Sequence, residues 1–234
     1  MSRLSAWRQW LAAARTRPGA YVAVAATLLG AYALFGTGMV AYTHAVTQGR
    51  IAANEREQLM RAIGTVLPAN VYDNDPLRDT RRLYAPKWLG ADTAQVVYRA
   101  RRGGRPAAAV FSVVAPDGYG GPIHLLVCVA ADGRVLGVRV VSHQETPGLG
   151  DAIDSAHSNW VGGFAGRRLG DPPLKRWKVK RDGGVFDQFT GATISPRAVV
   201  GAVRRCLQYF RAHREAVFAS AAGQRSVQEE NNDE

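Results

Sequence analysis

The fold of this chain is decided by the stretch Thr190-Gly-Ala-Thr-Ile-Ser195, which Pro196 follows directly. Serine is a favoured N-cap residue and proline suits the first position of a helix, so the stretch predicts a helix that Ser195 caps. Beyond it, apolar residues recur at helical spacing to about residue 219: Val199, Val203, Cys206, Phe210 and Val217. The sequence therefore predicts a small-residue turn and then a long amphipathic helix.

Thr193 lies just outside the predicted helix N-terminus. Unpaired backbone N–H groups and the helix dipole favour a phosphate at such a position. Gly191 and Ala192 leave the Thr193 hydroxyl uncrowded, so that a bulky group can reach it. The same residues are also compatible with an ordinary capped turn that binds nothing.

A second candidate loop is His143-Gln-Glu-Thr-Pro-Gly-Leu-Gly150. Pro147 stiffens it, and Gly148 and Gly150 permit close approach of a ligand to the backbone. The backbone N–H groups are candidates for the polar edge of a bound ring system, and Leu149 for its apolar face. The alternative is a simple strand-to-helix turn in which Asp151 caps the next helix.

Alternating patterns predict strands at 95–100, 107–114, 123–130 and 134–141, with Asp132-Gly133 as a hairpin turn between the last two. A fifth strand is predicted at 176–180, and an amphipathic stretch near Ile153, Trp160 and Phe164. Residues 70–86 are expected to form loops. The predicted fold class is α+β, an antiparallel sheet with packed helices behind one N-terminal transmembrane helix.

The N-terminal region predicts a membrane anchor. Residues 20–40 carry no charge, and about twenty such residues span a bilayer. Before them lie four arginines and no acid in a short amphipathic segment, which is typical of the cytoplasmic membrane surface. The expected topology has the N-terminus in the cytoplasm and the main domain in the periplasm of a bacterium. A cleavable signal peptide is the alternative, but the apolar run is longer than the usual 7–15 residues.

Several function classes find no support in the sequence. The net charge of +11 is spread along the chain without a nucleic-acid motif, which fits anionic lipid or an acidic redox partner better. The histidines lack metal-ligand spacing, so His143 is expected to be a structural or surface histidine, and no catalytic triad pattern indicates hydrolysis. The two cysteines, Cys128 and Cys206, are expected to be buried; their spacing leaves a disulfide open.

Together the two loops resemble the covalent-FMN domain family, which includes the G component of the Rnf electron-transport complex. A related branch is the C component of the sodium-pumping NADH:quinone reductase. The resemblance covers residues 98–203, and its best pieces are 118–121, 143–150 and 177–200. It implies FMN joined through a phosphoester to Thr193. The other residues that it places at the flavin are Thr190, Gly191, Ala192, Ser195, Glu145, Thr146, Gly148 and Leu149.

The resemblance also implies a function: electron transfer through covalent FMN in a redox-driven, ferredoxin- and NAD-linked ion translocase, with the chain itself as a carrier. Expected partners are the other subunits of the complex, a flavin transferase and membrane lipid, and no nucleic acid. The alternatives are the quinone-reductase component and a membrane-anchored FMN-domain sensor or assembly module. The expected division is a basic segment, an anchor, a connecting region, the FMN-binding domain and a polar tail, at 1–18, 19–43, 44–93, 94–219 and 220–234.

Overall fold

The computed structural model describes residues 18–219, without the side chains at 18, 20, 48–53 and 55. Residues 1–17 of the basic segment expected at 1–18, and the polar tail expected at 220–234, lie outside this range. The chain divides into two compact units, residues 1–57 and 58–234.

The described part of the first unit is the beginning of the long helix α2, Pro18–Val66. Within it, Tyr21–Thr47 is long and apolar enough to cross a membrane, and its side chains are exposed rather than packed in a protein core. Threonine hydroxyls within this span donate to carbonyls of the preceding turn, as in Thr27 to Ala23 at 2.9 Å. Such bonds satisfy the hydroxyls inside an apolar medium.

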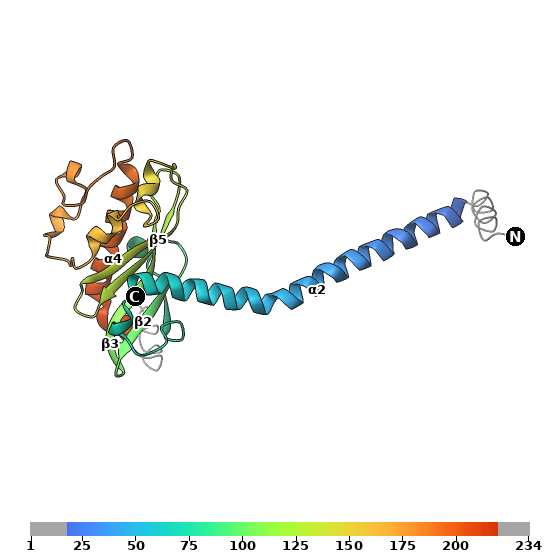
Figure 1. Cartoon of the computed structure of the whole chain (residues 1–234), viewed down its shortest axis with the longest axis horizontal. Helices are drawn as coiled ribbons and strands as arrows, with labels where there is room; N and C mark the ends of the chain where they lie inside the picture. Colours follow the sequence, from blue (N-terminus) through green and yellow to red (C-terminus); the bar gives the residue numbers. More distant parts are fainter. Residues whose placement is uncertain (1–17, 220–234) are drawn as a thin grey trace, which may run out of the picture. The chain divides into compact units, whose positions relative to one another are not determined.

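The second unit is built on a five-stranded antiparallel sheet in which each strand pairs with the next along the chain (Figure 1). Successive side chains along each strand point to opposite faces of the sheet, as in any pleated strand. Four of the strands confirm those predicted from the alternation. In chain order the strands are β1 (Thr80–Leu83), β2 (Gln95–Arg102), β3 (Arg105–Ala115), β4 (Ile123–Ala130) and β5 (Val135–Ser142).

Both faces of the sheet are covered. On one face lie α4 (Ile194–Phe218) and α3 (Pro86–Leu89), with Phe111 of β3 packed edge-on against Tyr209 and Phe210 of α4. The opposite face holds the end of α2, where Ile63 is fully buried among side chains of β2, β3 and β4. The predicted α+β class is therefore confirmed, and α4 is held against the centre of the sheet.

Strand β1 lies in a segment for which the sequence predicts loops. It has only one buried residue, Leu83, and its stability comes from elsewhere in the chain. Arg99 of β2 forms an ion pair with Asp79, just before β1, and donates to the Ala219 carbonyl at 2.5 Å. Arg101 donates to Asp79 at 2.7 Å. Positive charge at a helix C-terminus complements the helix dipole, so these arginines also hold the end of α4.

The segment between β5 and α4 has no strand. It consists of short 3-10 turns, η2 (Gly150–Ile153), η3 (Trp160–Phe164), η4 (Leu174–Arg176) and η5 (Lys180–Asp182). A further 3-10 turn, η1 (Ala69–Val71), follows α2. The strand predicted at 176–180 is therefore wrong: alternate residues there are buried, but the segment makes only an isolated bridge, Val179 to Phe186.

Aromatic packing replaces regular hydrogen bonding in this segment. Phe164 stacks on Phe186 with ring centroids 4.5 Å apart, and fully buried Trp177 lies 5.3 Å from Phe186. The Trp177 indole N–H donates to the Pro172 carbonyl at 3.1 Å. Large aromatic surfaces of this kind fix an irregular backbone without a ladder of backbone bonds.

The two cysteines are free and buried. Cys128 packs on the α2 face of the sheet and Cys206 on the α4 face, which confirms their expected role as small apolar residues. Burial raises the pKa of the Cys128 thiol to about 12, and the pKa of Cys206 is also raised, first by burial and then by Cys128.

Candidate functional site

Two loops and the start of α4 meet at one end of the sheet. Because neighbouring strands are antiparallel, the end of β3, the start of β4 and the end of β5 lie at the same end, where His124 pairs with Ser142. The loops at 116–122 and 143–149 therefore leave the sheet side by side. The helix α4 crosses the sheet so that its first turn reaches the same place.

A cavity of about 310 Å³ lies between these segments. Its lining comes from all three: Tyr119, Glu145, Thr146, Leu149, Gly150, Gly191, Ala192, Thr193, Ile194 and Ser195. Three large apolar residues at its rim are unusually exposed, Tyr119 at 70%, Leu149 at 45% and Ile194 at 44%. An open apolar rim with a few polar groups inside is typical of a ligand pocket.

Thr193 occupies the N-cap position of α4, and its hydroxyl forms no capping hydrogen bond. The carbonyl of Thr193 accepts the Arg197 N–H at 3.3 Å, so the backbone of this residue holds its place while the side chain takes no part in the cap. The preceding turn closes with the Ala192 N–H on the Phe189 carbonyl at 3.1 Å. Gly191 has a φ of 82° in this turn, a conformation that favours glycine.

The prediction that Ser195 caps the helix is wrong. Helix α4 begins at Ile194, so that Ser195 lies inside its first turn and Pro196 one position later. Ser195 is fully buried, and its hydroxyl donates to Oε2 of Glu145 at 2.6 Å. The Ser195 hydroxyl, which local sequence preference assigns to the helix cap, is therefore hydrogen-bonded instead to the Glu145 carboxylate, fifty positions earlier in the sequence.

The loop at 143–150 is shaped by its own hydrogen bonds. The Thr146 carbonyl accepts the N–H groups of Leu149 at 3.2 Å, Gly150 at 3.1 Å and Asp151 at 3.4 Å. The N–H groups of Leu149 and Gly150, which belong to the predicted loop, are therefore used within it and are not available to a ligand. The His143 ring accepts the Glu145 N–H through Nδ1 at 3.1 Å, which fits its expected structural role.

An ion pair fixes the first turn of α4 from outside. Arg197 binds both carboxylate oxygens of Asp182, at 2.7 and 2.8 Å. This hydrogen-bonded fork, followed by the charge of Arg197, lowers the pKa of Asp182. Gln188 adds a link to the same segment by accepting the Arg181 N–H at 3.2 Å.

The structure brings most of the residues predicted at the flavin into this one cavity. Thr190 and Gly148 are the exceptions, since neither lines it. Three lining residues lie outside the set predicted at the flavin: Tyr119, Ile194 and Gly150, of which Gly150 was expected only to permit close approach to the loop backbone. Tyr119 stands in the glycine-rich loop that carries part of the family resemblance, so that its position was a usable signal.

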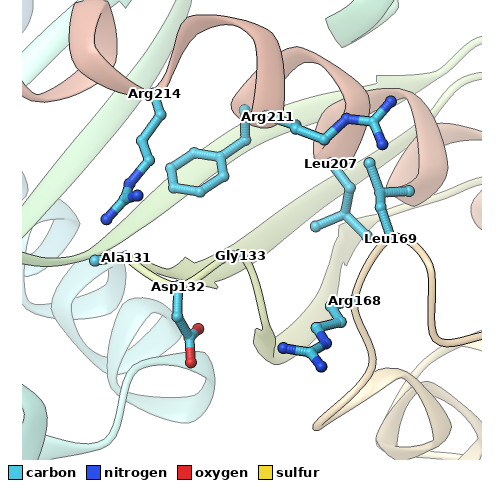
Figure 2. A pocket seen from close by; sticks show the side chains of 9 residues that line it. Ala131, Asp132, Gly133, Arg168, Leu169, Leu207, Arg211 and Arg214 are labelled. Carbon is cyan, nitrogen blue, oxygen red and sulfur yellow. The ribbon is translucent and has the colours of Figure 1, made fainter.

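A second cavity, of about 230 Å³, shares no lining residue with the first. It lies between the β4–β5 turn and the C-terminal half of α4, where Figure 2 shows the side chains of Arg168, Arg211 and Arg214 around it. Asp132 in that turn is paired with Arg134 at 2.8 Å. None of the predicted flavin residues lies there, so the flavin hypothesis rests on the first cavity.

The first cavity fits a flavin in chemical terms. Its rim offers apolar and aromatic side chains for a ring system, and Thr193 offers an unengaged hydroxyl at the positive end of a helix dipole. At about 310 Å³ the cavity is within the usual range for small-molecule pockets, roughly 300–1,000 Å³.

Comparison with known proteins shows the class of protein to which this chain belongs. Residues 118–208 match the FMN-binding domain family, and residues 22–66 match the RnfG N-terminal region family. The first match covers the cavity and the second covers the apolar helix. The chain is thus an FMN-binding domain protein with one candidate membrane-spanning helix in its described part.

Curated relatives narrow the class, and each is the G component of an ion-translocating oxidoreductase complex. The relative from Pseudomonas aeruginosa is 53% identical over 200 residues, covering 85% of this chain and 94% of the relative. That of Cereibacter sphaeroides is 50% identical, covering 84% and 87%. That of Vibrio cholerae is 46% identical, covering 80% and 90%. The chain belongs to this family, the G components of ion-translocating oxidoreductase complexes.

Proposed function

We propose that this protein is the membrane-anchored FMN subunit of an Rnf-type, ferredoxin- and NAD-linked ion-translocating complex, and that it carries electrons between other centres of that complex. The family membership and the FMN-binding domain support this role. The chain alone is a carrier, because the ion movement belongs to the assembled complex. Its partners are the other subunits, a flavin transferase and membrane lipid, and not nucleic acid.

The proposed attachment site is Thr193. The observation that supports it is a threonine hydroxyl without a capping bond, at a helix N-terminus and on the wall of the cavity. Oγ1 of Thr193 would form the bond to the FMN phosphorus while an activated flavin nucleotide loses its leaving group, and the transferase would take the hydroxyl proton. The N-terminus of α4 stabilises the negative charge that the phosphodiester retains.

The remaining residues have distinct roles in this proposal. Leu149, Ile194 and Tyr119 pack on the ring and exclude water from it. Glu145 and Ser195 hold the loop and the helix together, while Thr146 offers a polar contact. Gly191 and Ala192 keep the approach to Thr193 open. When bound, FMN supplies reversible electron uptake, and the protein supplies its position and electrostatic surroundings.

Substitution of Thr193 by alanine tests the attachment. Full-length protein made together with the transferase should carry one FMN-sized addition on the peptide that contains Thr193, and Thr193→Ala should remove it without unfolding the protein. The matched control is Thr190→Ala, which lies in the same turn but does not line the cavity. Covalent flavin that persists in Thr193→Ala would refute the site, and dissociable flavin in the parent would refute the covalent bond.

The proposed location is the bacterial inner membrane, with the N-terminus in the cytoplasm and the FMN-binding domain in the periplasm. The support is the arginine-rich sequence before an uncharged helix. A reporter fused after residue 234 should be active only in a periplasm-competent form. Activity of a cytoplasm-only reporter at the same position would reverse the topology.

A further inference from the structure

One acidic side chain at the cavity is buried without a cation. Glu145 is only 5% exposed, and it forms no ion pair with any residue between 18 and 219. Its Oε2 accepts the Ser195 hydroxyl at 2.6 Å, and its Oε1 accepts the Gly120 N–H at 3.3 Å. Buried carboxylates are usually paired with a cation, because the loss of hydration is unfavourable for an unpaired charge. A carboxylate that is buried without a cation at the wall of a pocket therefore points to a functional role rather than a stabilising one.

The surrounding backbone is built to admit this carboxylate. A Cβ at Gly118 would lie 2.8 Å from Oε1, and one at Gly150 would lie 2.7 Å from Oε2. A Cβ at Gly120 would lie 1.8 Å from the Gln144 carbonyl oxygen, in the residue just before Glu145. Three glycines from two loops thus approach the Glu145 segment more closely than any other residue type could.

The geometry points to Glu145 as a fixed negative charge that lowers the reduction potential of the flavin, with Ser195 as the residue that positions it. This inference rests on the proposed function. Flavin bound in the cavity would gain negative charge when it takes up an electron, and the Glu145 carboxylate lines the same cavity. Because charges interact more strongly where water is excluded, the reduced state is destabilised relative to the oxidised state. Glu145 makes and breaks no bond in this role.

The positioning of the charge follows from the hydrogen bond between Ser195 and Glu145. It ties the carboxylate to the first turn of α4, two residues after Thr193, so that the charge and the attachment point move together. The positive end of the α4 dipole stabilises the carboxylate at this place. Shortening the side chain should therefore weaken the effect, and neutralising it should remove the effect.

The test is the midpoint potential of the full-length, detergent-solubilised protein that carries flavin. Glu145→Gln keeps the shape and removes the charge, because its amide can donate to Ser195 Oγ while its oxygen accepts the Gly120 N–H. Glu145→Asp keeps the charge and withdraws it from Ser195. The potential should rise in the order parent, Glu145→Asp, Glu145→Gln. The control Asp117→Asn removes one charge from the exposed part of the Gly120 loop and should leave the potential unchanged.

The outcomes separate this inference from the proposed function. A parent protein without flavin on Thr193 would refute the attachment proposal, as measured by peptide mass spectrometry before any titration. Flavin-loaded parent and Glu145→Gln with equal potentials would refute the role of Glu145. If Glu145→Gln does not fold or does not take up flavin, a Glu145→Asp potential equal to that of the parent refutes it instead. A rise as large in Asp117→Asn would show general surface charge to be the cause.

Discussion

Replacement of Gly150 by alanine tests the packing around Glu145 without changing any charge. The new Cβ would lie 2.7 Å from both Glu145 Oε2 and Ser195 Oγ, so these two groups must separate. Gly150 does not have a positive φ, which means that backbone strain does not contribute to the effect.

The cost can be worked out from these contacts. Loss of a hydrogen bond to a charged group costs about 1.5–3 kcal/mol, and overpacking about 1–3 kcal/mol. The two overlap, because relief of the clash is what breaks the bond. Alanine also restricts the unfolded chain, which returns about 0.4–1 kcal/mol. We therefore expect a net loss of about 0.5–2.5 kcal/mol, or about 1–10 °C in the melting temperature of the FMN-binding unit.

The measurement is thermal unfolding of the full-length protein in detergent, followed by near-ultraviolet circular dichroism. Gly163→Ala is the matched control, since a Cβ there meets no atom within 4 Å and its φ is not positive. The control should melt about 1–4 °C above the parent, because alanine restricts the unfolded chain there as well and meets no clash in the folded protein. The effect on the unfolded chain cancels between the two variants, so Gly150→Ala should melt about 3–12 °C below the control. A difference of less than about 1 °C would refute the close packing of Gly150 on the carboxylate.

Two further predictions concern stability and reactivity. Arg99→Met should destabilise the protein by about 2–3 kcal/mol, below the full cost of breaking a buried ion pair because Arg101 still binds Asp79; urea unfolding measures it, and a loss under about 0.5 kcal/mol, the size of a surface substitution, would contradict the clamp on α4. Cys128 and Cys206 should resist a thiol reagent at about pH 8 in the folded protein, since burial raises the pKa of both thiols, and should react fully in urea. Rapid labelling of folded protein would show that one of them is accessible.

The regular part of the fold could be predicted from the sequence because its signals are local. The alternation in β2 to β5 and the helical spacing in α4 each arise within one element. These patterns show which side chains of each element are buried against the rest of the fold. Strand β1 could not be predicted, because Thr80–Leu83 has a single buried residue and depends on arginines of β2. The strand predicted at 176–180 failed for the opposite reason: buried Trp177 and Val179 alternate with exposed cations, but the segment makes only the isolated bridge from Val179 to Phe186.

The candidate site shows the same division. The turn at 190–193 and the position of Thr193 before a helix could be predicted from small residues and helical spacing. The role of Ser195 could not, because the Ser-Pro sequence favours a cap while the true partner, Glu145, is distant in the sequence. The sequence also could not predict which residues of the 143–150 loop line the cavity. The conformation of this loop depends on three hydrogen bonds to the Thr146 carbonyl, and no sequence pattern predicts them.

The hydrogen bond between Glu145 and Ser195 closes a loop of fifty residues, whereas the hairpins of the sheet close over a few. Long closures cost more chain entropy and form later than local pairs. We therefore expect the hairpins to assemble before this contact, and Thr193 to reach its final surroundings only when the segment between β5 and α4 has packed. An enzyme that recognises Thr193 in those surroundings would attach flavin only to folded chains. The presence of covalent flavin would then indicate that a chain has completed folding.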